Sequence, residues 1–217
     1  NGTLNAGKFF TNPTDGIVVY VEGTTSASPS TVHTFEINND EVILVNVEDV
    51  EGICGAAQTK SQVFLEGNRL ITSCLSNSPP LEEVTIKEFS WNGASWIFVT
   101  ETTVDSSDLF NMSPGRLHRA TGTFAVPYQH DDNSYGIRFF ETNMDGNWIL
   151  VQDLPIDTPL GCGQLFGNGL DYSNTDHFIT TDSGFTWGDP YYSKTAINLT
   201  LDNGSWALSS QTNITDW

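Results

Sequence analysis

An aromatic loop is the first group of residues whose side chains could carry chemistry. It contains Trp187, Asp189, Tyr191 and Tyr192 within the stretch TWGDPYY. Exposed rings can cover a sugar face, and a nearby carboxylate can accept hydrogen bonds from sugar hydroxyls. We predict that these four residues form a ligand-binding surface for glycans. The competing interpretation, that the rings are packing, stays open because a β-sheet core uses many aromatic residues.

An acidic loop is the second group, and it resembles a cation site. Asp171, Asn174 and Asp176 lie within DYSNTD, and their oxygens are of the kind that Ca²⁺ prefers. The loop lacks the glycine that lets a calcium loop turn sharply around its ion. Two interpretations remain, a Ca²⁺ site made by these three residues or an Asx-rich turn that caps two strands. We expect no other cofactor.

Cysteine is the third candidate residue type. Cys54 and Cys74 lie on either side of a predicted strand, Gln62 to Leu65, so the sequence predicts a disulfide between them in an oxidising compartment. Cys162 is left over in a GCG context. We interpret it as a small buried thiol, because no histidine lies near it in sequence to activate a nucleophile.

No familiar catalytic motif is present. The sequence contains no G-x-S-x-G, no H-E-x-x-H, no P-loop and no G-x-G-x-x-G that opens a helix. Adjacent carboxylates such as Glu82-Glu83 carry no information in a chain so rich in acid. His118 lies in the only basic cluster, Arg116 to Arg119, which we interpret as local charge balance. We predict no catalytic residues and therefore no enzyme.

The charge of the chain limits its partners. Its 217 residues include 27 Asp+Glu and 8 Lys+Arg, which gives a net charge of −19. Such a surface repels nucleic-acid backbones and anionic membranes, so we expect neither nucleic-acid binding nor membrane insertion. No apolar run is long enough to span a bilayer. Because the sequence begins at Asn1, we expect a processed product or an excerpt. The acidic surface and the cysteines that could form a disulfide predict a location outside the cell or at the cell surface.

Sequons for N-glycosylation are consistent with that location. Five N-x-[ST] sequences occur, and each asparagine is a predicted glycosylation site: Asn1, Asn111, Asn198, Asn203 and Asn213.

The elements that must position these residues are β-hairpins. Val84 to Val104 alternates apolar and polar residues on both sides of Asn92-Gly93, which is a strong hairpin signal, and we expect a type I′ turn there. The same pattern returns in three other places. The residues that follow the four turns are Val42, Trp96, Trp148 and Trp206, spaced 54, 52 and 58 residues apart, and we expect the three tryptophans to be packing.

A second recurring piece, a glycine-bearing loop with two short strands, separates these hairpins. Each unit therefore has four strands, and the sequence predicts an all-β, β-propeller-like array of four such units in a single domain, 1–217. The predicted units are 32–83, 84–133, 134–193, and a last unit split between 194–217 and 1–31. In this arrangement the N-terminal strands complete the C-terminal hairpin.

The repeats resemble a known family. In the stretch 135–182, DGNWILVQDLPID is followed by LFGNGLDYSNTDHFITT, with Phe166-Gly167 at the place of a conserved F-G pair. This pattern resembles the FG-GAP-like, integrin-alpha-type β-propeller repeats of secreted and surface proteins. Together with the absence of catalytic motifs, the resemblance implies a non-enzymatic structural or adhesive protein. The split unit further predicts self-association into filaments through its complementary halves. The alternative is a lectin-like propeller that binds glycans through Trp187 to Tyr192.

Overall fold

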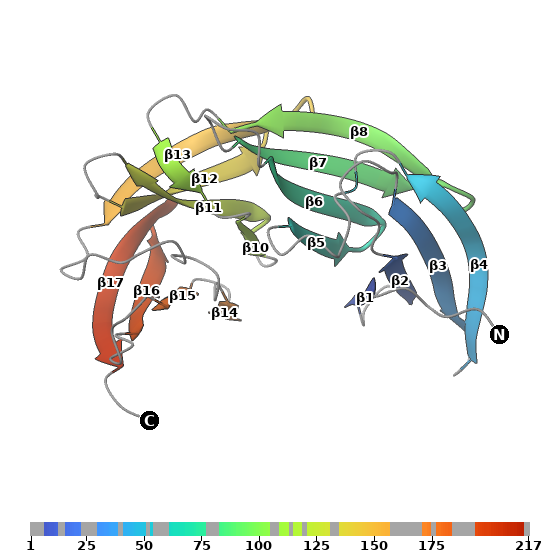
Figure 1. The fold of residues 1–217 in the computed structure, drawn as a ribbon, viewed down its shortest axis with the longest axis horizontal. Helices are drawn as coiled ribbons and strands as arrows, with labels where there is room; N and C mark the ends of the chain where they lie inside the picture. The colour runs from blue at the N-terminus through green and yellow to red at the C-terminus, as the bar shows by residue number, and fades with distance from the viewer. Residues whose placement is uncertain are drawn as a thin grey trace. The chain divides into compact units, whose positions relative to one another are not determined.

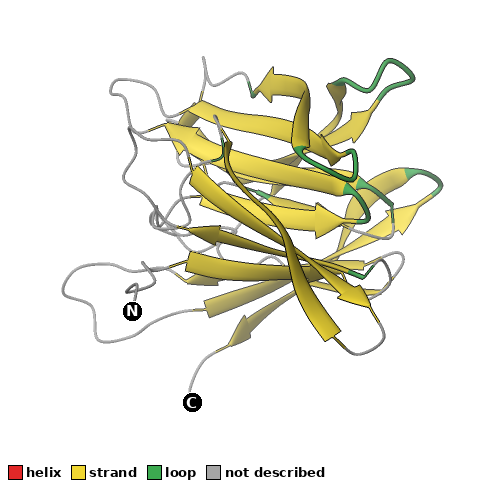
Figure 2. Cartoon of the chain, turned by 90° about the vertical axis from the view of Figure 1, so that its right-hand side faces the viewer, coloured by secondary structure: helices red, strands yellow, loops and turns green. Residues whose placement is uncertain are grey.

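The computed structural model describes residues 7–12, 16–22, 30–38, 41–50, 53, 61–76, 83–104, 109–112, 115–118, 121–130, 135–156, 171–174, 177–183 and 194–214. Within these ranges every regular element is a β-strand (Figure 2). None of these residues forms a helix with the length and apolar character needed to cross a membrane.

The strands form four antiparallel sheets, and strands that are consecutive in the sequence are neighbours in each of them, with one exception in the third sheet (Figure 1). The first sheet contains β1 (Gly7–Asn12), β2 (Ile17–Glu22), β3 (Ser30–Asn38) and β4 (Glu41–Val50). The second contains β5 (Ser61–Glu66), β6 (Arg69–Ser76), β7 (Glu83–Trp91) and β8 (Trp96–Thr103).

The third sheet has the order β10 (Arg116–His118), β11 (Thr123–His130), β12 (Tyr135–Thr142) and β13 (Trp148–Ile156), with β9 (Leu109–Met112) paired to β11. The fourth contains β14 (Asp171–Asn174), β15 (His177–Ser183), β16 (Lys194–Asp202) and β17 (Ser205–Ile214). The chain divides into two compact units, Asn1–Leu75 with Thr85–Val104 and Ser76–Val84 with Asp105–Trp217. Unit 1 holds the first two sheets and unit 2 the last two.

The predicted hairpins are confirmed, but two of their turns are longer than expected, the one after Trp91 and the one after Thr142. Asn203 and Gly204 have φ values of 50° and 80°, and Asp202 pairs with Ser205, which is the expected two-residue turn with positive φ at both positions. At the predicted hairpin of unit 1 the connection has four residues instead, because Trp91 pairs with Trp96. There the Asn92 side chain accepts hydrogen bonds from the N–H groups of Ala94 and Ser95, which stabilises a longer turn.

The predicted split unit does not form. β1 and β2 belong to the same sheet as β3, to which β2 pairs directly, while the C-terminal hairpin β16–β17 pairs with β15 of its own sheet. Strands that follow one another closely in the chain usually pair, and they do so here. The period of a repeat is the same whichever residue is taken as the start of a unit, so the period alone does not locate the boundaries between units. The sheets therefore lie in contiguous stretches, and the unit boundaries are shifted from the predicted ones.

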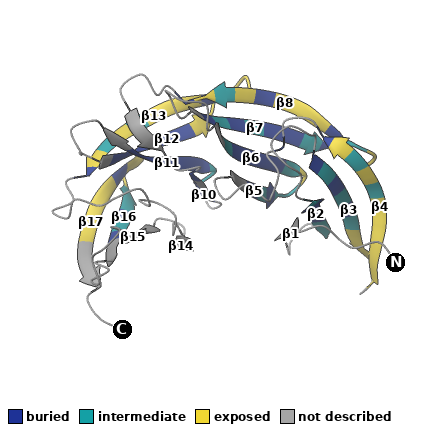
Figure 3. Cartoon of the chain, viewed as in Figure 1, coloured by how far each residue is buried: buried dark blue, intermediate teal, exposed yellow. Residues whose placement is uncertain are grey.

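The outermost strand of each sheet carries a β-bulge at the equivalent position. The register shifts between Thr34 and Phe35, between Glu88 and Phe89, between Phe139 and Phe140, and between Asn198 and Leu199. In β8 and β13 the bulge follows a buried tryptophan, and three consecutive residues of each strand are exposed (Figure 3). A bulge on an edge strand twists it and discourages further strand pairing.

The tryptophans that close the hairpins are core residues, as expected. Trp96, Trp148 and Trp206 are 5%, 2% and 3% exposed. In unit 1 the Trp96 indole N–H donates to Thr34 Oγ1 of the first sheet over 2.9 Å. In unit 2 the Trp206 ring stacks on Phe139 of the third sheet, with centroids 5.6 Å apart and planes at 9°. The closing tryptophan thus packs one sheet of a unit onto the sheet before it.

Candidate functional site: a hydrogen-bonded acid–base centre

Most residues of the predicted ligand and metal sites lie outside the described part of the chain. This holds for the aromatic loop with Trp187, Asp189, Tyr191 and Tyr192, and for Asp176. For Asp171 and Asn174 only the backbone is described. They lie at the two ends of β14 and pair with Ile179 and His177. Among the described residues, no group of three His, Cys, Asp or Glu side chains is placed to hold a metal ion. The Ca²⁺ site stays a prediction.

Cys74 is disulfide-bonded. Cys54 and Cys162 both lie outside the described residues, so the pairing of Cys74 with Cys54 stays a prediction. Of the sequon asparagines, Asn1 is outside the described residues, while Asn111 and Asn213 lie in β9 and β17. Asn198 lies within β16, and its side-chain oxygen is buried. Asn203 is exposed at the tip of the last hairpin. Glycosylation at these positions stays a prediction.

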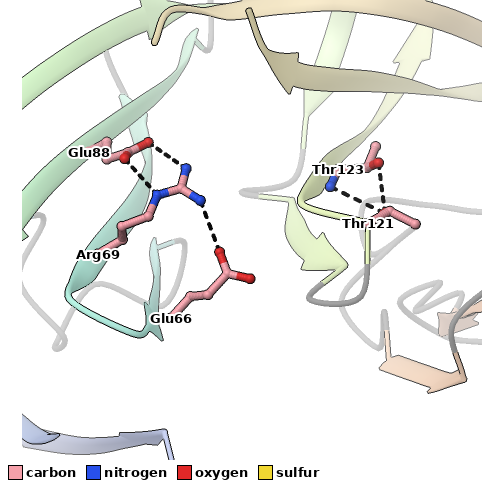
Figure 4. A network of polar contacts seen from close by, with 5 residues as sticks. All are labelled: Glu66, Arg69, Glu88, Thr121 and Thr123. Atoms are coloured by element: carbon pink, nitrogen blue, oxygen red, sulfur yellow. Dashed lines mark hydrogen bonds and ion pairs between the residues drawn. The ribbon is translucent and has the colours of Figure 1, made fainter. Parts of the chain in front are cut away.

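A polar centre that the sequence analysis missed lies at the turn between β10 and β11. The N–H groups of Thr121 and Gly122 donate to the His118 carbonyl, at 3.3 and 2.9 Å, and Gly122 supplies the positive φ (71°) that the turn needs. The turn brings the Thr121 hydroxyl to 2.9 Å from His118 Nδ1 and 2.8 Å from Thr123 Oγ1 (Figure 4 shows the two threonines). The Thr123 hydroxyl in turn lies 3.1 Å from Glu141 Oε1 on β12. We call these four residues the acid–base centre.

The direction of every hydrogen bond in the acid–base centre follows from its carboxylate end. An ionised Glu141 can only accept, so the Thr123 hydroxyl must donate to it. With its one proton used, Thr123 accepts from Thr121, and Thr121 then has no proton left for the imidazole. His118 must therefore donate through Nδ1–H, which makes Nε2 the basic nitrogen of the neutral ring.

The acid–base centre runs from the protein interior to its surface. His118 is 0% exposed and Thr123 is 1% exposed, whereas Glu141 is exposed. The cross-strand register explains the last contact, since Phe124 pairs with Phe140 and Thr123 thus lies opposite Glu141. At the matching place in the first sheet, Glu36 is also exposed but pairs with Ile17, whose side chain has no hydroxyl. Glu141 is thus a surface carboxylate with a buried hydrogen-bonded anchor.

A second polar network occupies the corresponding turn of the second sheet, in unit 1. Arg69 donates from Nε and Nη2 to the two oxygens of Glu88, at 2.7 and 2.9 Å, and from Nη1 to Glu66 at 3.1 Å (Figure 4). The Glu88 side chain is 8% exposed. These hydrogen bonds, above all those to Glu88, raise the pKa of Arg69 against the opposite effect of burial. Because both carboxylates already use its donors, we assign this network to stability.

The chemistry of the acid–base centre is proton transfer at an oriented carboxylate. Glu141 can take a proton from water, and the Thr123 hydroxyl fixes the direction in which it does so. Sequence reasoning interpreted His118 as part of a charge-balanced cluster and did not single out the threonines. The available signal was H-x-x-T-G-T at a predicted glycine turn. The role of Glu141 depends on the register between β11 and β12, which cannot be read from the sequence.

Comparison with known proteins gives likeness of fold only. No family model matches the chain, and no curated protein matches it. A protein from Lactobacillus plantarum aligns with 98% of this chain at 11% identity and a TM-score of 0.53, and this chain spans 58% of that protein. Candidate 6-phosphogluconolactonases from Bacteroides fragilis and Bacteroides uniformis align with 95% of this chain, at 8% and 9% identity and TM-scores of 0.46 and 0.45, over 70% of their own length.

These findings confirm the fold class and correct the family and function. The all-β, propeller-like array of four-stranded sheets is confirmed. The resemblance to FG-GAP repeats is wrong, because no family model matches the chain. Its F-G and D-G-x-W elements are turn signals that any sheet of this type can carry. The expectation of a non-enzymatic structural or adhesive protein is also corrected, since two of the three similar structures are named as candidate enzymes and none of the three is named as a structural or adhesive protein.

Proposed function

We propose that the chain carries the acid–base centre of a hydrolase that opens an ester bond, with Glu141 as the general base. The observation that supports this is the single directed chain of hydrogen bonds from buried His118 through Thr121 and Thr123 to Glu141. An exposed glutamate on a β-strand is ordinarily free to rotate. A glutamate anchored through two hydroxyls to a buried ring keeps its orientation, and orientation is a large part of general-base catalysis.

The reaction balances with this one carboxylate. Glu141 takes a proton from water while the water oxygen bonds to the carbonyl carbon of the ester. When the tetrahedral intermediate collapses, the bond to the alkoxy oxygen breaks, and Glu141 returns the proton to that oxygen. The products are a carboxylic acid and an alcohol, which remain in one molecule when the substrate is a lactone. His118, Thr121 and Thr123 are positioning residues in this scheme.

Sugar lactones are the first substrates to test, because two of the similar structures are named as candidate 6-phosphogluconolactonases. The net charge of −19 favours an uncharged lactone over a phosphorylated one, since a negative surface lowers the local concentration of anions. An oxidising compartment, extracellular or at the cell surface, remains part of the proposal and is supported by the disulfide at Cys74.

The test measures proton release in a pH-stat with glucono-δ-lactone and its 6-phosphate, corrected for spontaneous hydrolysis. Glu141→Gln should lower kcat by about 10²- to 10⁴-fold, the usual contribution of a general base. Glu36→Gln is the matched control, because Glu36 is an exposed glutamate at the equivalent strand position, and it should keep the wild-type rate. A wild-type rate in Glu141→Gln, or no rate above the spontaneous one in the wild type, would contradict the proposal.

A further inference from the structure

We infer that Gln152 is a positioning residue of the acid–base centre, which it serves by holding Trp206 against His118. The inference rests on the proposed function for its catalytic meaning. It makes the fourth sheet part of the site, although that sheet contributes no group to the hydrogen-bonded chain itself.

The side-chain amide of Gln152 binds both backbone groups of Trp206. Trp206 N–H donates to Gln152 Oε1 over 2.8 Å, and Gln152 Nε2 donates to the Trp206 carbonyl over 2.6 Å. Gln152 lies on β13 of the third sheet, and Trp206 lies near the start of β17 of the fourth. We call this pair of bonds the Gln152–Trp206 clamp. It fixes the backbone from which the indole projects, and it does so across two sheets of unit 2.

The clamped indole meets the buried end of the acid–base centre. Its centroid lies 5.0 Å from that of His118, with the planes at 73°, an edge-to-face contact. On Phe139 the same indole is stacked. His118 is 0% exposed and Trp206 is 3% exposed. The imidazole is therefore fixed by the Thr121 hydroxyl at Nδ1 and by the indole against its ring, and a shift of Trp206 would free the ring to turn away from Thr121.

Unit 1 has a similar clamp, in which the clamped indole packs on another indole in the described part of the chain. There the N–H of Trp96 donates to Glu48 Oε1 over 2.8 Å. The Trp96 ring packs against Trp91, with centroids 5.4 Å apart. Loosening this clamp would disturb the packing of a hairpin tryptophan in unit 1, whereas His118 lies in unit 2. Glu48→Leu is consequently the matched control for Gln152→Leu.

Acylation of histidines by diethyl pyrocarbonate, mapped by peptide mass spectrometry, tests the inference without reference to activity. The reagent modifies accessible imidazoles, and His33, with a side chain 21% exposed, serves as the internal reference. In the wild type and in Glu48→Leu, His118 should react far more slowly than His33. In Gln152→Leu, the loss of two hydrogen bonds should raise the His118 rate about tenfold or more. Gln152→Glu, which keeps only the acceptor, should give an intermediate rate.

The kinetic expectation is a fall in kcat at unchanged KM in Gln152→Leu and no change in Glu48→Leu, because only the first clamp positions the base. An unchanged His118 acylation rate in Gln152→Leu, or an equal increase in Glu48→Leu, would overturn the inference. If Gln152→Leu does not fold, the Gln152→Glu variant decides the question by the same rates. Should the wild type hydrolyse no lactone, the proposed function fails, while the acylation result still decides whether Gln152 holds His118 in place.

Discussion

Replacing Arg69 by methionine should destabilise the protein far more than its surface position suggests. The variant keeps most of the side-chain length but removes all three hydrogen bonds to Glu88 and Glu66. Breaking a buried ion pair from one side costs about 3–5 kcal/mol, because the other charge is left without a partner. Exposed pairs are worth about 0–1 kcal/mol. Since the Glu88 side chain is 8% exposed and that of Arg69 is 31% exposed, we expect a value between these limits, about 2–3 kcal/mol.

Urea denaturation followed by circular dichroism and tryptophan fluorescence measures this loss. The control is Lys87→Met on β7, the strand that carries Glu88. Lys87 pairs with Glu101 at 2.9 Å, but Glu101 is 45% exposed, so this variant should cost less than about 1 kcal/mol. The double variant Arg69→Met/Glu88→Leu should regain much of the loss, since the buried Glu88 carboxylate is removed together with its partner and only the more exposed Glu66 loses a contact. A midpoint shift in Arg69→Met no larger than that of Lys87→Met would refute the reasoning.

Two glycine substitutions in unit 2 should differ in their effect on stability. In Gly136→Ala the new Cβ would overlap the Tyr128 hydroxyl oxygen. Tyr128 is held by Asp153, to which it donates, and by Arg138, whose guanidinium lies 5.2 Å from the centre of its ring. We expect a loss of about 1–3 kcal/mol from this overpacking. Gly122→Ala meets no atom within 4 Å and costs only the strain of its φ of +71°, about 1 kcal/mol. Urea midpoints compare the two, and a Gly136→Ala variant as stable as Gly122→Ala would contradict the packing.

The sequence predicted the hairpins because their signals are local. Alternation of apolar residues on either side of Asn203-Gly204 determines the strands, the turn and the register together. The recurrence of Trp96, Trp148 and Trp206 then predicted both the number of repeats and the burial of the indoles. Which strands share a sheet was less accessible, because a period does not specify where a unit begins. Hence the pairing of β2 with β3 replaced the predicted split unit.

The acid–base centre could not be predicted because it depends on two registers at once. Thr121 and Thr123 approach His118 through a tight turn, and Glu141 joins them only because β12 pairs with β11 in one particular register. A shift of that register by one residue would place a different side chain beside Thr123. The contact of Trp206 with His118 further requires two sheets to pack. Side-chain chemistry at the predicted aromatic loop, by contrast, was inferred from residue types alone.

The protonation state of His118 tests the central claim most directly, because the directed chain from His118 to Glu141 permits only one neutral tautomer. Side-chain ¹⁵N chemical shifts of selectively labelled histidine, assigned with a His118→Gln variant, report which nitrogen carries the proton. We expect His118 to carry its proton on Nδ1 and to have a basic Nε2, and the Thr121→Val variant to lose this preference. A wild-type His118 protonated on Nε2, with Nδ1 as an acceptor, would contradict the directed chain and with it the anchoring of Glu141.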